Sequence, residues 1–147
     1  MLENKIMDQL KLAMKAKDKV ALESLRAIKS ALLMAKTETG KETVITEEQE
    51  ITILQRLIKQ RKEAAEQFGN DRKELAEKEL AQAEIIQSFL PKQFSKEEVT
   101  AIIKVIINET AAKDLKDLGK VMAIASKQLL GKAEGKTISE ITKLLLS

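Results

Sequence analysis

The chain has 147 residues, with 26 Lys or Arg against 23 Asp or Glu, and a formal net charge of +3. It contains no Cys, His, Trp or Tyr, so disulfides, thiolate chemistry, the usual zinc ligands and the commonest general base are excluded. No run of about 18 apolar residues could span a membrane, and the first residues lack the unbroken apolar core of a signal peptide. We therefore expect a cytoplasmic protein with no membrane segment, no metal and no cofactor.

Apolar residues recur at every third or fourth position, which predicts an all-α fold beginning with an N-terminal helical hairpin or bundle. A first helix, about residues 2–17, has the stripe Leu2, Ile6, Leu10 and Ala13. Asp18 can cap a second helix, whose stripe is Ala21, Leu25, Ile28, Leu32 and Ala35. Gly40 is predicted to stop it, and Val44-Ile45 is too short for a strand.

The next two helices form a second predicted pair. Thr46 and Gln49 make a capping box for a helix over about 47–68. The apolar face of that helix consists of Ile51, Leu54, Ile58, Ala65 and Phe68. After Gly69, Asn70 or Asp71 can cap a fourth helix, which runs to about residue 89. The residues of this helix that are predicted to face inward are Ala76, Leu80, Ala83 and Leu90.

Pro91, the only proline, stops the fourth helix and marks a domain border. Residues 1–91 hold 16 basic and 16 acidic side chains, whereas residues 92–147 hold 10 Lys against 7 acids, so the whole excess charge lies in the second part. We predict an N-terminal helical domain over 1–91 and a small three-helix bundle over 92–147.

The tail begins with a capping box of Ser95 and Glu98 and an apolar face of Val99, Ile102, Ile103, Ile106 and Ile107. Asp114 or Asp117 is expected to cap a second helix, with the stripe Leu118, Val121, Met122, Ala125 and Leu129. Gly131 is predicted at the left-handed C′ position that ends it. Thr137 and Glu140 predict a third capping box, for a last helix with Ile138, Ile141, Leu144 and Leu145 inward.

The stretch "GKAEGKT", from Gly131, resembles a phosphate-binding P-loop but is one residue short of G-x-x-x-x-G-K-[ST]. A P-loop also follows a β-strand, and this stretch follows a predicted helix. We interpret it as a turn between helices, in which Gly131 and Gly135 serve the backbone and Thr137 caps the next helix.

The chain has few side chains that could act in catalysis, and we predict no catalytic residue. The serines have no His to activate them. Glu47, Glu48 and Glu50 suit the positive end of a helix dipole, while Glu63 and Glu66 suit ion pairs with Lys59 and Lys62.

Two sets of cations are candidate binding residues. In the tail these are Lys120, Lys127, Lys132 and Lys136, which could contact a nucleic-acid backbone or simply be solvated. A second patch would comprise Arg56, Lys59, Arg61 and Arg72, for which ion pairs between helices are the alternative. Arg61 lies in line with Ile58 and Ala65, so its stem could rest on the core.

Several segments carry a family resemblance. "LIKQRKEAAEQF", "DRKELAEKELAQAEIIQSFLPKQFSKEEV" and "DLGKVMAIASKQLLGKAEGKTISEITKLLL" resemble the bacterial YqeY family over essentially the whole chain. The tail is similar to the C-terminal helical domain of the B subunit of glutamyl- and aspartyl-tRNA amidotransferases. The matching positions are Lys59-Gln60-Arg61, Phe68, Arg72, Glu79, Leu90-Pro91, Gly119-Lys120-Val121-Met122, Gly131-Lys132-Ala133 and Gly135-Lys136. Gly135 departs from the amidotransferase tail, which tends to Pro there.

The resemblance implies an all-helical fold and tRNA as a partner. It also carries a family-level label of carbon–nitrogen ligase with glutamine as amido donor, but the catalytic cradle of the amidotransferase lies in a domain that these residues do not contain. Our leading hypothesis is a non-catalytic module that binds tRNA or a tRNA-bearing complex. The second is a protein-interaction adapter that uses the apolar faces of Ile102–Ile107 and Leu144–Leu146. Glutamine-dependent amide transfer is the third.

Overall fold

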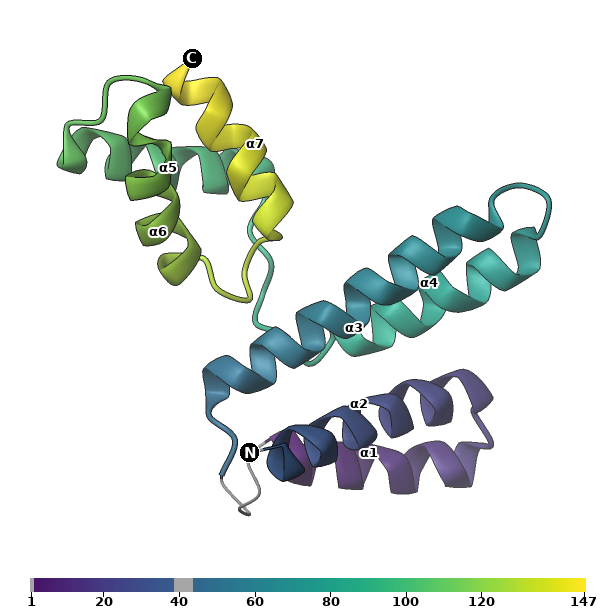
Figure 1. Ribbon diagram of the computed structural model, residues 1–147. Coiled ribbons are helices and arrows are strands. Elements are labelled where there is room, and N and C mark those ends of the chain that lie inside the picture. Colours follow the sequence, from purple (N-terminus) through teal and green to yellow (C-terminus); the bar gives the residue numbers. More distant parts are fainter. Residues whose placement is uncertain (1, 39–43) are drawn as a thin grey trace. The chain divides into compact units, whose positions relative to one another are not determined.

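The computed structural model describes residues 2–38 and 44–147. Over these ranges the chain forms seven α-helices, one 3-10 turn and no strand, so the all-α prediction is confirmed (Figure 1). It divides into two compact units, Met1–Leu90 and Pro91–Ser147. None of the described helices is both long and apolar enough to cross a bilayer.

The first unit opens with the hairpin of α1 (Leu2–Ala16) and α2 (Lys19–Thr37). The buried residues of α1 are Leu2, Ile6, Leu10 and Ala13, as the periodicity predicts. Asp18 caps α2 as expected, because its Oδ1 accepts a hydrogen bond of 3.1 Å from the Ala21 N–H. The predicted stop at Gly40 lies outside the described residues.

The second hairpin consists of α3 (Glu47–Phe68) and α4 (Lys73–Gln87). The capping box of Thr46 and Gln49 is confirmed, with both reciprocal hydrogen bonds formed. The predicted cap of α4 is wrong: the residue before the helix is Arg72, which makes no side-chain capping bond. Gly69 ends α3 with φ 56° and ψ −152°, a backbone conformation that only glycine adopts readily.

The buried sides of α3 and α4 differ from the predicted stripes. On α3, Ile53 and Leu57 join Leu54, Ile58 and Ala65 in the core, whereas Ile51 and Phe68 are half-buried. On α4, Leu80 is 47% exposed and the buried residues are Gln82, Ala83 and Ile86.

A buried amide explains why the stripe of α4 was predicted wrongly. Gln82 donates a hydrogen bond of 2.7 Å from Nε2 to Glu23 Oε2 of α2, and Lys78 Nζ lies 3.4 Å from the same oxygen. An interhelical polar contact therefore occupies a core position of α4. A search for apolar periodicity assigns such a position to the surface.

The second unit is a three-helix bundle of α5 (Lys96–Thr110), α6 (Leu118–Gln128) and α7 (Gly135–Leu146), with the 3-10 turn η1 (Leu115–Asp117) before α6. Ser95 Oγ accepts from the Glu98 N–H at 3.1 Å, which is one half of the predicted capping box. Asp114 caps η1 through the Lys116 N–H. The predicted cap at Thr137 is wrong, because α7 begins two residues earlier and Glu134 precedes it.

The core of this bundle comes from all three helices and from the turn between α6 and α7. Its buried members are Val99, Ile103, Ile106, Val121, Ala125, Leu129, Ala133, Ile138, Ile141 and Leu146. Thr142 is also fully buried, and its hydroxyl donates to the Ile138 carbonyl at 2.7 Å, so no polar group of that side chain is left unpaired.

Two helices end on a non-glycine residue in the left-handed conformation, Lys17 with φ 55° and Ala111 with φ 54°. At Ala111 the next N–H, that of Ala112, returns to the Ile107 carbonyl at 3.1 Å, which is the closing hydrogen bond of a Schellman turn. A Cβ in this conformation costs about 1–2 kcal/mol, because it crowds the following carbonyl oxygen.

Replacing Ala111 with Gly should therefore raise the free energy of unfolding by about 1 kcal/mol. Ala101 is the matched control: it is exposed inside α5, where Ala→Gly should lower the same free energy by about 1 kcal/mol. Urea titration followed by circular dichroism measures both. Equal destabilisation by the two substitutions would contradict the left-handed end of α5.

Glu50 gives a prediction about pH. It lies half-buried in the first turn of α3, and burial is the largest cause of a raised pKa at its carboxyl group. Because the pKa is higher in the folded than in the unfolded chain, the folded chain binds more protons between the two values. The stability contributed by this group is therefore present at low pH and falls as the pH rises through that window.

Glu50→Gln should accordingly raise the melting temperature at pH 7 and have little effect near pH 4, close to the unfolded pKa of a Glu. Glu47→Gln, at an exposed position in the same first turn, should instead lose about 0.3–1 kcal/mol of helix-dipole stabilisation at pH 7. Thermal melts across this pH range distinguish the two; a loss of stability in Glu50→Gln at pH 7 would show that the dipole outweighs burial.

Candidate nucleic-acid interface

The turn between α6 and α7 is fastened to the segment that precedes α5. The Phe94 N–H donates to the Lys132 carbonyl at 2.8 Å, and the Gln93 side-chain amide donates to the carbonyls of Gly131 and Pro91. Leu129 is fully buried and Ala133 is 8% exposed, so the turn is anchored in the core on both sides of Gly131. We call these contacts of Gln93 and Phe94 the strap.

The glycines of the "GKAEGKT" stretch have different roles. Gly131 is buried and has φ 77°, which confirms a left-handed glycine after α6, although two residues beyond the cap Leu129 rather than one. Gly135 begins α7, and a Cβ there would meet no atom within 4 Å. The stretch follows a helix, so it lacks the strand that a P-loop requires.

Lys132 is held by the same strap. Its Nζ lies 5.5 Å from the centroid of the Phe94 ring, within the range of a cation–π interaction, and the residue is half-buried. The strap therefore fixes both the backbone and the side chain of this lysine. Its ammonium group still has donors directed away from the ring.

Lys127 and Lys136 stand on either side of this turn. Lys127 is exposed in the last turn of α6, and Lys136 is exposed in the first turn of α7. Sequence reasoning missed Lys92, an exposed residue that the strap brings to the same place, because Phe94 lies only two residues further along the chain. No pattern in the sequence indicates Lys92, because its place beside the turn depends on the tertiary hydrogen bond from the Phe94 N–H to the Lys132 carbonyl. We call Lys92, Lys127, Lys132 and Lys136 the turn cluster.

Lys120 lies elsewhere in the same unit. It is two residues into α6, and its Nζ is 3.5 Å from the carbonyl oxygen of Thr110, at the end of α5. Seven residues separate Lys120 from Lys127, which places them on the same side of α6 but about 10 Å apart along its axis. The four lysines named from sequence therefore divide into three at the turn and one near the opposite end of the bundle.

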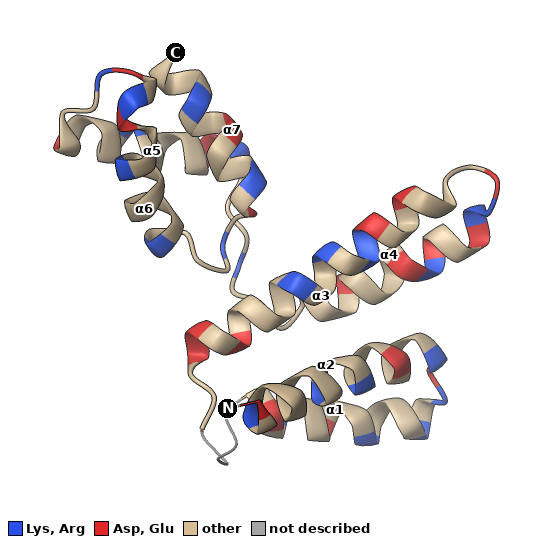
Figure 2. Cartoon of the chain, in the orientation of Figure 1, with Lys and Arg blue, Asp and Glu red and all other residues tan. Residues whose placement is uncertain are grey.

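The four cations named in the first unit are dispersed. Arg56 and Lys59 are exposed on α3, and Lys59 Nζ lies 4.0 Å from Glu63 Oε1, the predicted i,i+4 pair. Arg61 is half-buried, and its Nε is buried without a hydrogen-bond partner. Arg72 precedes α4, at the far end of the hairpin. Acidic side chains alternate with these cations along α3 and α4 (Figure 2).

The apolar faces that suggested a protein adapter are largely internal. Ile103 and Ile106 are at most 1% exposed, and Ile102 and Ile107 pack against the same core. Leu146 is buried too, whereas Leu144 is 72% exposed. The Ile-rich face of α5 is thus the core of the second unit.

The described residues contain no group of three or more Asp or Glu side chains arranged to hold a metal ion. The carboxylates of Asp114 and Asp117 accept hydrogen bonds from the backbone N–H groups of Lys116 and Lys113, at 2.9 Å each. Two acidic residues of the second unit are thus engaged in shaping the connection before α6, away from the turn cluster.

Comparison with known proteins gives one family and no curated relative. No curated protein matches the chain. The family model described as "Yqey-like protein" matches residues 3–146, nearly the whole chain, so the resemblance to the YqeY family is confirmed. The chain belongs to the YqeY family.

Proposed function

We propose that this protein is a non-catalytic helical module that binds tRNA, or a complex that carries tRNA, through the turn cluster. The observation that carries the proposal is the strap, because it gathers Lys92, Lys132 and Lys136 around one rigid turn. Lysines held on a fixed backbone lose less entropy on binding phosphates than lysines on a mobile loop.

The chemistry of the surface favours a phosphate backbone over bases. No Trp or Tyr exists in the chain, and the Phe94 ring is already engaged by Lys132, so this surface offers no platform for base stacking. The first turn of α7 holds Lys136, and its leading N–H groups have no acceptor within the helix. Both features suit a phosphate oxygen, whereas the exposed carboxylate of Glu134, which precedes the helix, opposes one.

The choice of tRNA among RNAs rests on the similarity of the tail to the C-terminal domain of the amidotransferase B subunit. The proposal assigns no reaction to this chain. A structured RNA would be recognised by the spacing of its phosphates, and the residues that bind it would be lysines rather than residues that read sequence.

The first test is the salt dependence of tRNA binding. Unfractionated tRNA should bind at low salt, and Lys127→Glu with Lys136→Glu should weaken binding at least about tenfold, because two phosphate contacts become repulsive. The slope of log affinity against log salt should fall by about 0.7–0.9 for each lost contact. Filter binding at several salt concentrations measures both quantities.

The control is Lys104→Glu with Lys113→Glu, which changes the charge by the same amount on exposed residues away from the turn. This control should retain most of the affinity. Equal losses in the two double variants would mean that binding follows total charge, and no binding by the unaltered protein at low salt would overturn the proposal.

A second test concerns the strap. Gln93→Leu leaves the buried Gly131 carbonyl without its donor, which should lower the free energy of unfolding by about 1–3 kcal/mol. It should also weaken tRNA binding at a temperature where the variant is fully folded, although no charge has changed. Gln128→Leu, at an exposed position on α6, is the control and should alter neither quantity. Unchanged tRNA affinity in folded Gln93→Leu would mean that positioning by the strap is unimportant.

A further inference from the structure

The α1–α2 hairpin exposes an unusual number of large apolar side chains. Met7 is 41% exposed, Met14 53% and Leu33 60%, and the hairpin also carries Leu12 at 58% and Met34 at 62%. Methionine is flexible and polarisable, and it is common on surfaces that accept partner helices. Exposed apolar residues gathered on one element indicate an interaction site more often than residues scattered singly.

Three of these side chains share one side of the hairpin. Glu3 and Lys36 form an ion pair of 2.7 Å between α1 and α2. Met7 lies four residues after Glu3 and Leu33 three residues before Lys36, so both flank that pair. Met14 follows Met7 by seven residues and therefore lies on the same side of α1.

Cations lie between and beside these apolar residues. Lys11 separates Met7 from Met14 along α1, and Lys29 and Arg26 continue the line of Leu33 along α2. All three are exposed, and none has an ion pair within residues 2–38 and 44–147. We call the six residues the outer face: Met7, Lys11, Met14, Arg26, Lys29 and Leu33.

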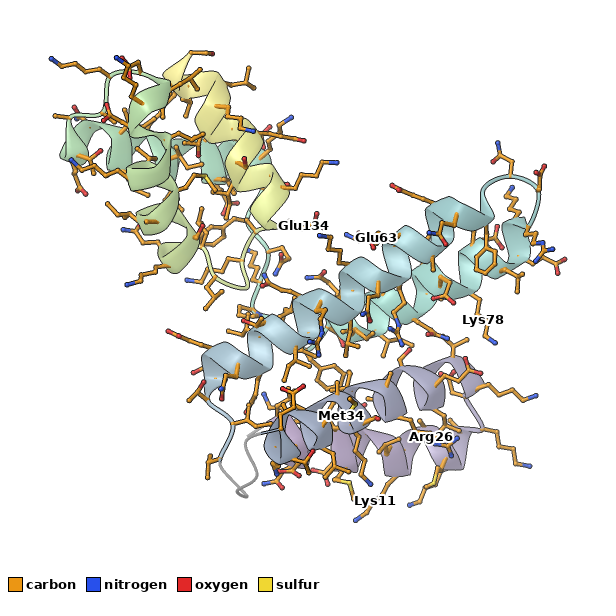
Figure 3. The ribbon with its side chains drawn as sticks, in the orientation of Figure 1. Lys11, Arg26, Met34, Glu63, Lys78 and Glu134 are labelled. Atoms are coloured by element: carbon orange, nitrogen blue, oxygen red, sulfur yellow. The ribbon has the colours of Figure 1, made fainter. Side chains whose placement is uncertain are left out.

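Two of the labelled side chains of this hairpin in Figure 3, those of Lys11 and Met34, lie on different sides of it. Lys11 extends away from α3 and α4, whereas Met34 lies on the side of α2 turned toward α3. Leu33 and Met34 are neighbours in sequence, but successive helical residues are about 100° apart around the axis. Met34 is therefore outside the outer face.

The hairpin is also short of acidic groups to balance its cations. Residues 2–38 hold eight Lys or Arg against five Asp or Glu. Two of the five acids form ion pairs, Glu3 with Lys36 and Glu23 with Lys78 of α4. Asp8, Asp18 and Glu38 are left to offset the seven other cations of residues 2–38.

We propose that the outer face is a docking site for an acidic amphipathic helix of a partner protein. The apolar residues would pack against the apolar stripe of that helix, and Lys11, Arg26 and Lys29 would pair with Glu or Asp residues beside the stripe. Two antiparallel helices with exposed apolar residues along their outer side present a surface to which a third helix adds as in a bundle.

Charge selects this partner over the alternatives. A symmetric contact between two copies of the outer face would place Lys11, Arg26 and Lys29 against the same cations, which is repulsive. A nucleic-acid backbone would engage the cations but would leave Met7, Met14 and Leu33 without apolar contact. An acidic amphipathic helix satisfies both kinds of side chain at once.

The test uses a synthetic helical peptide of about 20 residues, with Leu along one stripe and Glu at the other positions. The full chain is labelled with ¹³C at its methionine methyl groups. The peptide should shift the Met7 and Met14 signals, while Met122, half-buried in α6, should not move. Leu-Lys and scrambled Leu-Glu versions of the peptide are the matched controls and should produce no shift.

Two variants locate the site. Met7→Gln with Leu33→Gln should weaken binding of the Leu-Glu peptide at least about tenfold, as should Lys11→Glu with Lys29→Glu. Leu12→Gln with Met34→Gln removes exposed apolar residues outside the outer face and should leave the affinity unchanged. All these positions are exposed, so thermal melts should show folded proteins.

Several outcomes would overturn the docking site. They are no methyl shift with the Leu-Glu peptide, equal shifts with the scrambled peptide, or equal loss in the Leu12 and Met34 control. Two further outcomes would assign the face to other ligands. Methyl shifts with vesicles of phosphatidylcholine and phosphatidylserine, but none with the peptide, would assign it to a lipid surface. Methyl shifts with tRNA alone would assign it to a nucleic acid. Sedimentation that shows self-association lost with the outer-face variants would assign the face to a second copy of the chain.

Discussion

The second unit depends on one backbone contact, the hydrogen bond from the Phe94 N–H to the Lys132 carbonyl at 2.8 Å. It joins the start of α5 to the turn between α6 and α7, and Gln93 reinforces it at Gly131. Without these donors two carbonyls in a largely buried turn would lose their hydrogen bonds, which is costly in an apolar environment. The contact therefore holds the turn that leads into α7, and with it the backbone of Lys132.

Most of the helices could be predicted from the sequence by rules that concern only neighbouring residues, namely helix capping and apolar periodicity. Asp18, Thr46 and Ser95 cap the helices they were predicted to cap, because each bond spans only three residues. The stripe of α1 and the bounds of α3 followed from apolar periodicity in the same way. The left-handed Gly131 also has a local cause, since the chain must reverse after α6.

The failures have tertiary causes. Gln82 is buried because Glu23, 59 residues away in the chain, accepts its hydrogen bond, and no periodicity within α4 contains that information. Thr137 has the spacing of a capping box, but the strap draws the preceding turn into the core and α7 starts at Gly135. Lys92 joins the turn cluster for the same reason. The outer face was missed because it combines residues from two helices, which pack together through a shared apolar core.

The first unit has no net charge as a whole, but its two hairpins differ in the sign of their net charge. Residues 44–90 hold seven basic against ten acidic side chains, the reverse of the excess on residues 2–38. The two hairpins that share the first core therefore carry opposite net charge. The pair of Glu23 with Lys78 takes an acid from the cationic hairpin and a lysine from the acidic one, so it leaves the cationic excess of residues 2–38 without an offset. The cationic excess then remains on the side of α1 and α2 that the shared core leaves exposed. Because that side also bears Met7, Met14 and Leu33, it differs from the turn cluster, where Lys127 and Lys136 have no exposed large apolar neighbour in the turn. A surface of lysines suits phosphates, and a surface of lysines with methionines suits an acidic helix, so the two proposed sites differ in the chemistry of the partner that each would bind.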